Sequence, residues 1–201
     1  MDALLRQQQR QEQRREQVLD AASICFRREG FQAASVNRIA EEAQMSVGHL
    51  YRYFDSKDAI VIALCERNFE DFISRSPILP GEQRFDSDAV IAAALSGFSE
   101  IVQRSKAAFV IEVYSHVERS KPIGDIVAHY DQRLRENAHQ FLAPLLPGAS
   151  EEVISTRIEM LLILIQGLWM RVVGDPAIDM ERLKMAFGDM LRLILTRDYQ
   201  G

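Results

Sequence analysis

The sequence is poor in the residues that build disulfide frameworks, metal sites and catalytic loops. Its 201 residues include only 2 cysteines, without a CxxC pair, and the 4 histidines are scattered at positions 49, 116, 129 and 139. It contains no glycine-rich phosphate loop and no nucleophile elbow, which are the common signatures of enzymes. We therefore expect reduced core thiols at Cys25 and Cys65, no cofactor, no metal site and no enzymatic activity.

Long hydrophobic runs are missing as well. The apolar runs, such as that at residues 160–165, are far shorter than the roughly 20 residues that span a bilayer. The polar start, MDALLRQQQRQEQRREQ, lacks the apolar segment of a signal peptide. With 47% apolar and 26% charged residues, the composition is that of an ordinary soluble protein. We expect a cytoplasmic protein without a membrane partner.

Charge is distributed unevenly along the chain. The net charge is −5, but residues 1–57 carry +1 and residues 58–201 carry −6. A small head that binds DNA, attached to an acidic body, is consistent with this division. The charge permits DNA binding without proving it.

Residues 35–57, SVNRIAEEAQMSVGHLYRYFDSK, hold the most informative pattern. Apolar residues recur at helical spacing in two short segments that are separated by a break of three or four residues. Ser35 and Ser46 stand where N-caps are expected, and the small Ala40 allows the two helices to cross closely. The pattern predicts a helix-turn-helix. Its apolar positions are Val36, Ile39, Ala40 and Ala43, then Val47, Leu50, Tyr51 and Phe54.

The second of these helices has a face suited to DNA. If Val47, Leu50 and Phe54 partly face the core, the remaining side chains present hydroxyls, an imidazole and a guanidinium without a carboxylate. Such a face suits phosphates and base edges. Core packing for Phe54, and an ordinary surface position for His49, are the alternatives. The exposed set is Gly48, His49, Tyr51, Arg52 and Tyr53.

Together with a preceding helix that ends in FRREGF, the run IAEEAQMSVGHLYRYFDSKDAI closely resembles the DNA-binding domain of the TetR/AcrR family of bacterial transcriptional repressors, over residues 14–65. The resemblance implies phosphate or base contacts from Ser35 and Asn37, and a phosphate contact from Lys57. One departure is Gln44, where the family usually has glycine; a left-handed glutamine would cost on the order of 1 kcal/mol. The implied recognition surface is Ser46, Val47, Gly48, His49, Tyr51, Arg52 and Tyr53.

The rest of the chain also predicts helices, about nine in all. The expected fold is all-α, with a three-helix DNA-binding domain at residues 1–57 and a helical effector-binding and dimerisation domain at residues 58–201. Residues 1–13 would form an arm before the first core helix, and residues 76–88, rich in proline, would form a loop. The predicted helices are 14–29, 36–43, 47–54, 56–75, 87–102, 106–119, 122–143, 151–173 and 179–195.

The last two predicted helices suggest a homodimer. Residues 160–165 are apolar on every side of their helix, more than a small core can cover. We expect four helices to meet across a two-fold axis, and the family resemblance implies the same architecture. The predicted interface is Leu161, Leu162, Ile165, Leu183, Phe187, Met190, Leu191 and Ile194.

Aromatic and polar residues between positions 87 and 174 suggest an effector site. They suit a small, mostly apolar ligand with a few polar anchors, although core packing explains each aromatic equally well. The expected function is a repressor that binds a palindromic, double-stranded operator as a homodimer and is released by a small-molecule effector. In the alternative, the C-terminal domain senses a protein partner or is a helical interaction module. The candidate lining is Phe98, Glu112, Tyr114, His116, Tyr130, Gln166 and Trp169.

Overall fold

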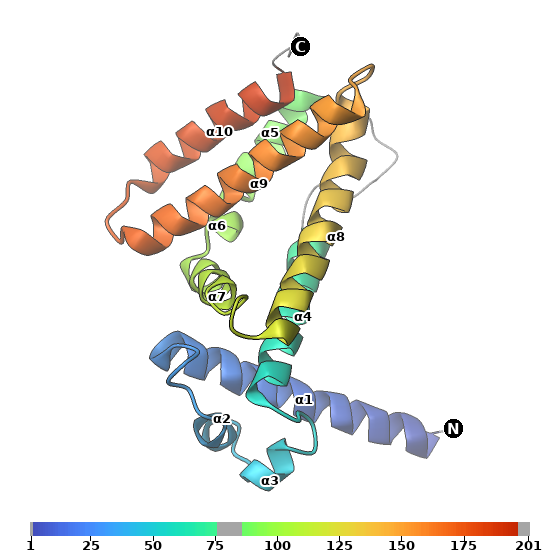
Figure 1. Cartoon of the computed structure of the whole chain (residues 1–201), viewed down its shortest axis with the longest axis vertical. Helices are drawn as coiled ribbons and strands as arrows, with labels where there is room; N and C mark the ends of the chain where they lie inside the picture. Colours follow the sequence, from blue (N-terminus) through green and yellow to red (C-terminus); the bar gives the residue numbers. More distant parts are fainter. Residues whose placement is uncertain (1, 76–85, 197–201) are drawn as a thin grey trace. The chain divides into compact units, whose positions relative to one another are not determined.

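A computed structural model describes residues 2–75 and 86–196 of the chain. These residues form α-helices joined by turns, without a strand, which confirms the all-α prediction (Figure 1). Most of the loop predicted at residues 76–88 lies outside the described residues. The helices are α1 (Asp2–Glu29), α2 (Val36–Glu42), α3 (Val47–Leu50), α4 (Lys57–Arg75), α5 (Ser87–Ser96), α6 (Phe98–Ile101), α7 (Arg104–Tyr114), α8 (Lys121–Leu145), α9 (Glu151–Gly174) and α10 (Met180–Thr196).

The chain forms two compact units that do not follow its order. The N-terminal unit comprises Met1–Glu70 together with Glu112–Val127, and the C-terminal unit comprises Asp71–Ile111 together with Ala128–Gly201. Helices α4, α7 and α8 each contribute residues to both units. The domain boundary predicted after residue 57 differs from this division, because it places residues 112–127 in the C-terminal domain and not in the N-terminal unit.

Serine side chains cap the N-termini of several helices, as the sequence predicts. The hydroxyl of Ser35 accepts from the Arg38 amide at the start of α2, and that of Ser46 accepts from the His49 amide at the start of α3, both at 3.2 Å. Ser150 caps α9 in the same way, at 3.3 Å from the Val153 amide. Each hydroxyl satisfies an amide that has no partner within its helix.

The predicted helix at residues 87–102 is interrupted. Gly97 caps the end of α5 with φ −84° and ψ 5°, and α6 begins at the next residue. Helical periodicity continues across this break, which is why the sequence pattern missed it. At the other end of the chain, the predicted arm is part of α1, which is helical from Asp2.

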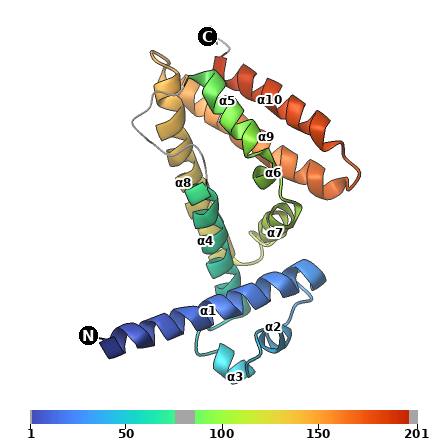
Figure 2. The same ribbon diagram turned by 180° about the vertical axis from the view of Figure 1, so that it is seen from behind.

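The core of the C-terminal unit lies between α5, α9 and α10, with side chains from α8. Figure 2 shows α5 beside α9 and α10. The rings of Phe98 and Phe187 have centroids 5.4 Å apart at the centre of this core. Helix α10 approaches α5 closely at Gly188, where a Cβ would lie 3.2 Å from a methyl carbon of Leu95. Side chains of α5 and α8 therefore pack against one side of α9 and α10.

Candidate DNA-binding site

Helices α2 and α3 form a helix-turn-helix, and a Schellman turn connects them. The amide of Gln44 donates to the carbonyl of Glu41 and that of Met45 donates to Ala40, each at 3.0 Å. Gln44 has φ +53°, so the position where the family usually has glycine is indeed left-handed here. Ala40, 1% exposed, lies in the core of the motif. The backbone turn is the one that glycine would favour, formed by glutamine.

Helix α3 ends at Leu50, earlier than the predicted 47–54, and the side chains of residues 46–54 divide into a buried, a half-buried and an exposed set. Leu50 and Phe54 are buried, whereas Tyr51 is 47% exposed and Arg52 is exposed. A Cβ at Gly48 would meet nothing within 4 Å, so packing within the chain does not require glycine there. His49, Tyr53 and Val47 are half-buried at the edges of this face, and Ser46, Ser35 and Asn37 are exposed. Open space at Gly48 leaves room for an external surface to approach.

Helix α1 holds the motif in place with polar side chains. Arg15 donates to the carbonyl of Tyr53 at 2.9 Å, and its guanidinium carbon lies 4.5 Å from the centroid of the Phe54 ring. Gln17 donates to the carbonyl of Ala43 at 2.7 Å, at the turn between α2 and α3. Helix α1 thus positions both the turn between α2 and α3 and residues 46–54, which we call the recognition segment.

Lys57, for which the sequence predicts a phosphate contact, binds backbone carbonyls of its own chain in the structure. Its ammonium group donates to the carbonyls of Phe31 at 2.9 Å and Ala34 at 3.3 Å. A third bond reaches the carbonyl of Gln32 at 3.4 Å, and the ammonium lies 4.7 Å from the Phe31 ring centroid. All three N–H groups therefore face the segment between α1 and α2. These carbonyls supply the negative partners that a lysine in the first turn of a helix requires.

Three residues that the sequence assigns to the effector site, Glu112, Tyr114 and His116, lie in the N-terminal unit instead. The carboxylate of Glu112 accepts from the amide of Phe31. His116, 6% exposed, packs its ring edge-on against that of Phe31, with centroids 4.5 Å apart. Ser120 donates to Asp58 of α4 at 2.7 Å. Residues 112–127 are thus part of the N-terminal unit. Their partners lie some 80 positions earlier in the chain, and a local sequence pattern does not reveal such contacts.

Charged pairs join the end of α1 to α2. Arg28 bonds Glu29 at 2.8 Å and Glu42 at 3.1 Å, and these contacts lie at the protein surface. The hydrogen bond from Arg28 lowers the pKa of the Glu29 carboxyl.

Burial acts in the opposite direction on the thiols of this unit, since it raises the pKa of Cys25 and raises that of Cys65 to about 12. Both cysteines are buried and reduced, as predicted.

Comparison with known proteins identifies the family. Residues 18–64 match the family described as bacterial regulatory proteins of the tetR family. Residues 85–196, more than half of the chain, match the C-terminal domain of BetI-type transcriptional repressors. The chain belongs to the TetR family. Members of this family are DNA-binding regulators and not enzymes, in agreement with the resemblance in the sequence.

Individual relatives support the same assignment. The repressor KstR of Rhodococcus jostii is 34% identical over 94 residues, which are 47% of this chain and 43% of KstR. The chain thus matches less than half the length of KstR. The regulator BetI of Vibrio campbellii is 26% identical over 192 residues, which are 91% of this chain and 92% of BetI.

Solved structures of similar fold extend over both units. A transcriptional regulator from Rhodococcus sp. Rha1 has a TM-score of 0.76 at 22% identity, covering 90% of this chain and 95% of its own. A regulator from Saccharomonospora viridis in complex with choline has 0.75 at 16% identity, covering 90% and 96%. FadR from Bacillus subtilis in complex with stearoyl-CoA has 0.66 at 21% identity, covering 90% and 97%. At these identities the likeness establishes the fold.

In this TetR-family protein, the remaining predicted effector residues are dispersed. Phe98 is part of the core, and the indole of Trp169 donates to the carbonyl of Ile101 at 2.8 Å. Gln166 and Tyr114 are exposed, whereas Tyr130 is half-buried. A broad open groove along α1 of the N-terminal unit is lined by none of the seven predicted residues; its lining is Gln9, Glu12, Gln13, Glu16, Gln17, Asp20, Ala21, Ile24, Glu42 and Ala43.

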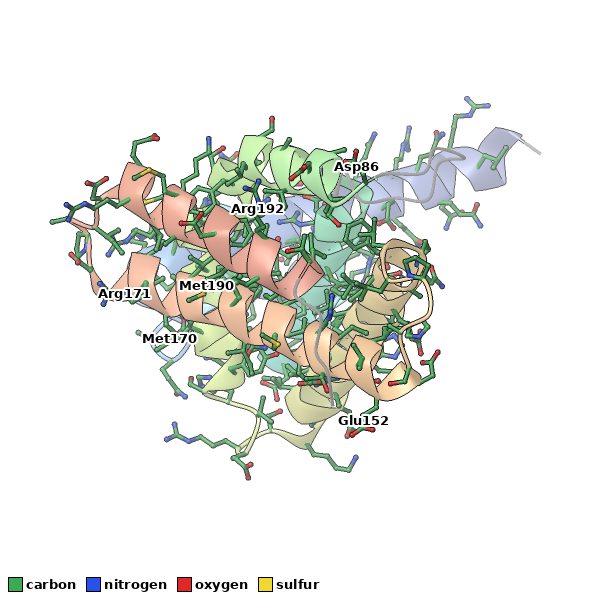
Figure 3. The ribbon with its side chains drawn as sticks, turned by 90° about the horizontal axis from the view of Figure 1, so that it is seen from above. Asp86, Glu152, Met170, Arg171, Met190 and Arg192 are labelled. Carbon is green, nitrogen blue, oxygen red and sulfur yellow. The ribbon has the colours of Figure 1, made fainter. Side chains whose placement is uncertain are left out.

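Four of the eight predicted interface residues of this TetR-family protein are buried within its own chain. Leu162, Phe187, Leu191 and Ile194 are buried, Leu161, Ile165 and Leu183 are half-buried, and Met190 is 53% exposed. The same two helices expose further large apolar side chains, among them Ile163 (66%), Met185 (63%), Met170 (60%) and Leu193 (54%). Figure 3 shows Met170 and Met190 on these neighbouring helices. We call Ile163, Met170, Met190 and Leu193 the exposed apolar face.

Helix α9 is also the one described helix that could cross a membrane by length and composition. A core helix of a soluble protein satisfies the same test, and six residues of α9 are buried in its own unit, including Ile154, Ile158 and Leu168. Packing within this TetR-family protein therefore accounts for one side of α9, and Ile163 and Met170 remain exposed on it.

Proposed function

We propose that this TetR-family protein is a cytoplasmic transcriptional repressor that binds a palindromic operator as a homodimer. A small, mostly apolar ligand in the C-terminal unit would release it from the DNA. The observation that carries the proposal is the recognition face itself, which exposes Tyr51, Arg52 and the space over Gly48 while Arg15 holds its backbone. Proposed DNA contacts are Ser35, Asn37, Ser46, Val47, Gly48, His49, Tyr51, Arg52, Tyr53 and Lys57.

The exposed apolar face supports a second copy of the chain as its partner. Single exposed apolar residues are normal, but four large ones on two adjacent helices favour an interface. Glu152 and Arg171 lie toward opposite ends of α9 (Figure 3). Antiparallel pairing of two α9 helices about a two-fold axis would bring Arg171 toward Glu152 of the partner subunit, at both ends of the seam.

Dimerisation would fix the spacing and orientation of the two half-sites that the protein can bind. Two recognition segments related by a two-fold axis can contact two half-sites that are about 34–36 Å apart, or a multiple of that distance. Each segment alone would bind weakly, and the pair gains affinity through effective concentration. A palindromic operator follows from the symmetry of the protein.

An effector in the C-terminal unit is supported by the two similar structures that contain choline and stearoyl-CoA. Phe98, Tyr130, Gln166 and Trp169 are the candidate lining residues in that unit, whereas the predicted residue Tyr114 belongs to the N-terminal unit. Because α4, α7 and α8 each belong to both units, a ligand that moves them would alter the DNA-binding head. Such coupling typically amounts to about 1–3 kcal/mol, or roughly 5- to 150-fold in affinity. In the alternative, a protein partner binds the same unit.

Selection from a randomised DNA duplex library tests the proposal. The wild-type protein should enrich a palindrome, and its affinity should fall steeply as salt is added. Arg52→Gln should weaken binding, whereas Arg182→Gln, which alters an exposed arginine on α10, should not. Failure of the wild-type protein to enrich any sequence would contradict DNA recognition.

A further inference from the structure

A histidine and a tyrosine on the recognition segment are joined by a hydrogen bond. His49 of α3 and Tyr53, one helical turn later, approach to 3.1 Å between Nε2 and the phenol oxygen. Their rings meet edge to face, with centroids 5.3 Å apart and an interplanar angle of 61°. Both side chains are half-buried, so each has one side toward solvent.

The tyrosine is held at both ends. Its carbonyl accepts from Arg15 of α1 at 2.9 Å, and Arg15 in turn stacks on the next residue, Phe54, at 4.5 Å. Its hydroxyl is engaged with His49. Since the backbone and the hydroxyl of Tyr53 are both fixed, the imidazole of His49 is also held in one orientation.

The direction of this contact decides which ring nitrogen of His49 carries the proton, and the strength of a phenol as a donor favours donation from Tyr53 to Nε2. A phenol is a strong hydrogen-bond donor, and the unprotonated nitrogen of a neutral imidazole is a good acceptor. Donation from Tyr53 therefore leaves Nε2 without a proton and places the proton on Nδ1. Within the described part of the chain, Nδ1 of His49 has no hydrogen-bond partner. The segment thus carries an N–H donor whose proton position is set from within the protein.

We propose that Tyr53 sets the base preference of His49. With Nε2 occupied, His49 can only donate toward DNA, and it therefore selects a base that presents acceptors in the major groove. Guanine fits best, because its N7 and O6 are adjacent acceptors, whereas cytosine presents an amino donor there. His49 is the specificity-determining residue and Tyr53 is a positioning residue. The inference rests on the proposed DNA recognition by this face.

Removal of the hydroxyl should relax specificity at one position only. In Tyr53→Phe the ring and its packing remain, but either nitrogen of His49 can carry the proton. His49 could then accept from the amino group of cytosine or adenine as well as donate to guanine. The discrimination of guanine from cytosine should fall roughly tenfold at that base pair, within the range of a single base contact.

The experiment compares selected sequences from a randomised duplex library for four proteins: wild type, Tyr53→Phe, His49→Ala and Ser99→Ala. Ser99→Ala removes an exposed hydroxyl from α6 and serves as the matched control. We expect wild type and Ser99→Ala to select guanine at one position of each half-site. His49→Ala should lose that preference, Tyr53→Phe should weaken it, and the salt dependence should be unchanged in all four.

Three outcomes would overturn the inference while leaving DNA recognition intact. Tyr53→Phe could keep the full guanine preference. It could lower affinity equally for every sequence with a shallower salt dependence, which would make Tyr53 a phosphate contact. His49→Ala could leave every base preference unchanged. Failure of the proposed function is distinct, because the wild-type protein would then select no sequence. Thermal unfolding of each variant by circular dichroism checks that it is folded.

Discussion

The carboxylate of Glu112 offers the most direct test of how residues 112–127 stabilise the DNA-binding head. It accepts a hydrogen bond from the main-chain amide of Phe31, a residue that is 7% exposed. The preceding residue, Gly30, has φ +80°, and a Cβ there would lie 3.4 Å from the same carboxylate oxygen. Glu112→Ala would leave the amide without its acceptor.

The magnitude follows from the type of bond. A hydrogen bond to a charged group contributes about 1.5–3 kcal/mol, and an amide left without a partner adds its desolvation cost. Glu112 is half-buried, so solvent weakens the charge contribution, and we expect the free energy of unfolding to fall by about 2 kcal/mol. Glu112→Gln keeps an acceptor oxygen and should lose about half as much.

Urea unfolding followed by circular dichroism measures this loss, and hydrogen exchange at the Phe31 amide localises it. Glu118→Ala is the matched control, because Glu118 is exposed in the same segment. Equal stability of the two alanine variants, or unchanged protection of the Phe31 amide in Glu112→Ala, would refute the assigned role of Glu112.

Three further predictions concern the turn, a thiol and the exposed apolar face. Gln44→Gly should stabilise the protein by up to about 1 kcal/mol in urea unfolding, because glycine removes the left-handed strain at φ +53°. Burial raises the pKa of the Cys65 thiol from its ordinary value near 9 to about 12, so stability should fall between those pH values as the unfolded state releases its thiol proton. At pH 10.5 the loss relative to Cys65→Ala should be about 2 kcal/mol. Met170→Glu should convert a dimer to monomers in sedimentation velocity, because it places a charge on the exposed apolar face.

Each of these has a matched control. Gln140→Gly makes the same substitution within α8 and should destabilise by about 1 kcal/mol; a loss of stability in Gln44→Gly would contradict the strain argument. Parallel pH profiles for wild type and Cys65→Ala would contradict the role of the thiol. Ala92→Glu adds the same charge to an exposed site on α5 and should leave the dimer intact. Dimeric Met170→Glu protein would place the interface elsewhere.

Local features of the molecule were predictable from the sequence. Ser35 and Ser46 cap their helices, and Leu50 and Phe54 are buried, because each depends on neighbours within one or two turns. The left-handed turn at Gln44 could be anticipated from the resemblance to the family, since its geometry is set by residues 40–45. Helix caps, periodicity and turn chemistry are short-range effects, and a single sequence contains all the groups involved.

The face that a uniformly apolar helix turns inward was not predictable. Leu162 and Ile163 are adjacent and equally apolar, yet the first is 8% exposed and the second 66%. Periodicity cannot distinguish them where every side is hydrophobic. The choice depends on how α9 packs against α5, α8 and α10, so the predicted interface included residues that the chain buries in its own core.

The sequence by itself determined an all-helical protein with a helix-turn-helix, and it predicts the residues that would contact DNA. The tertiary structure decided which distant groups support that motif: Arg15 at the carbonyl of Tyr53, Lys57 at the carbonyl of Phe31, and Glu112, about 80 residues away, at the amide of Phe31. The physical reason is the separation along the chain over which each kind of interaction acts. Capping and helical spacing act within a few residues, whereas a hydrogen bond between distant segments exists only after the chain has folded and brought donor and acceptor together.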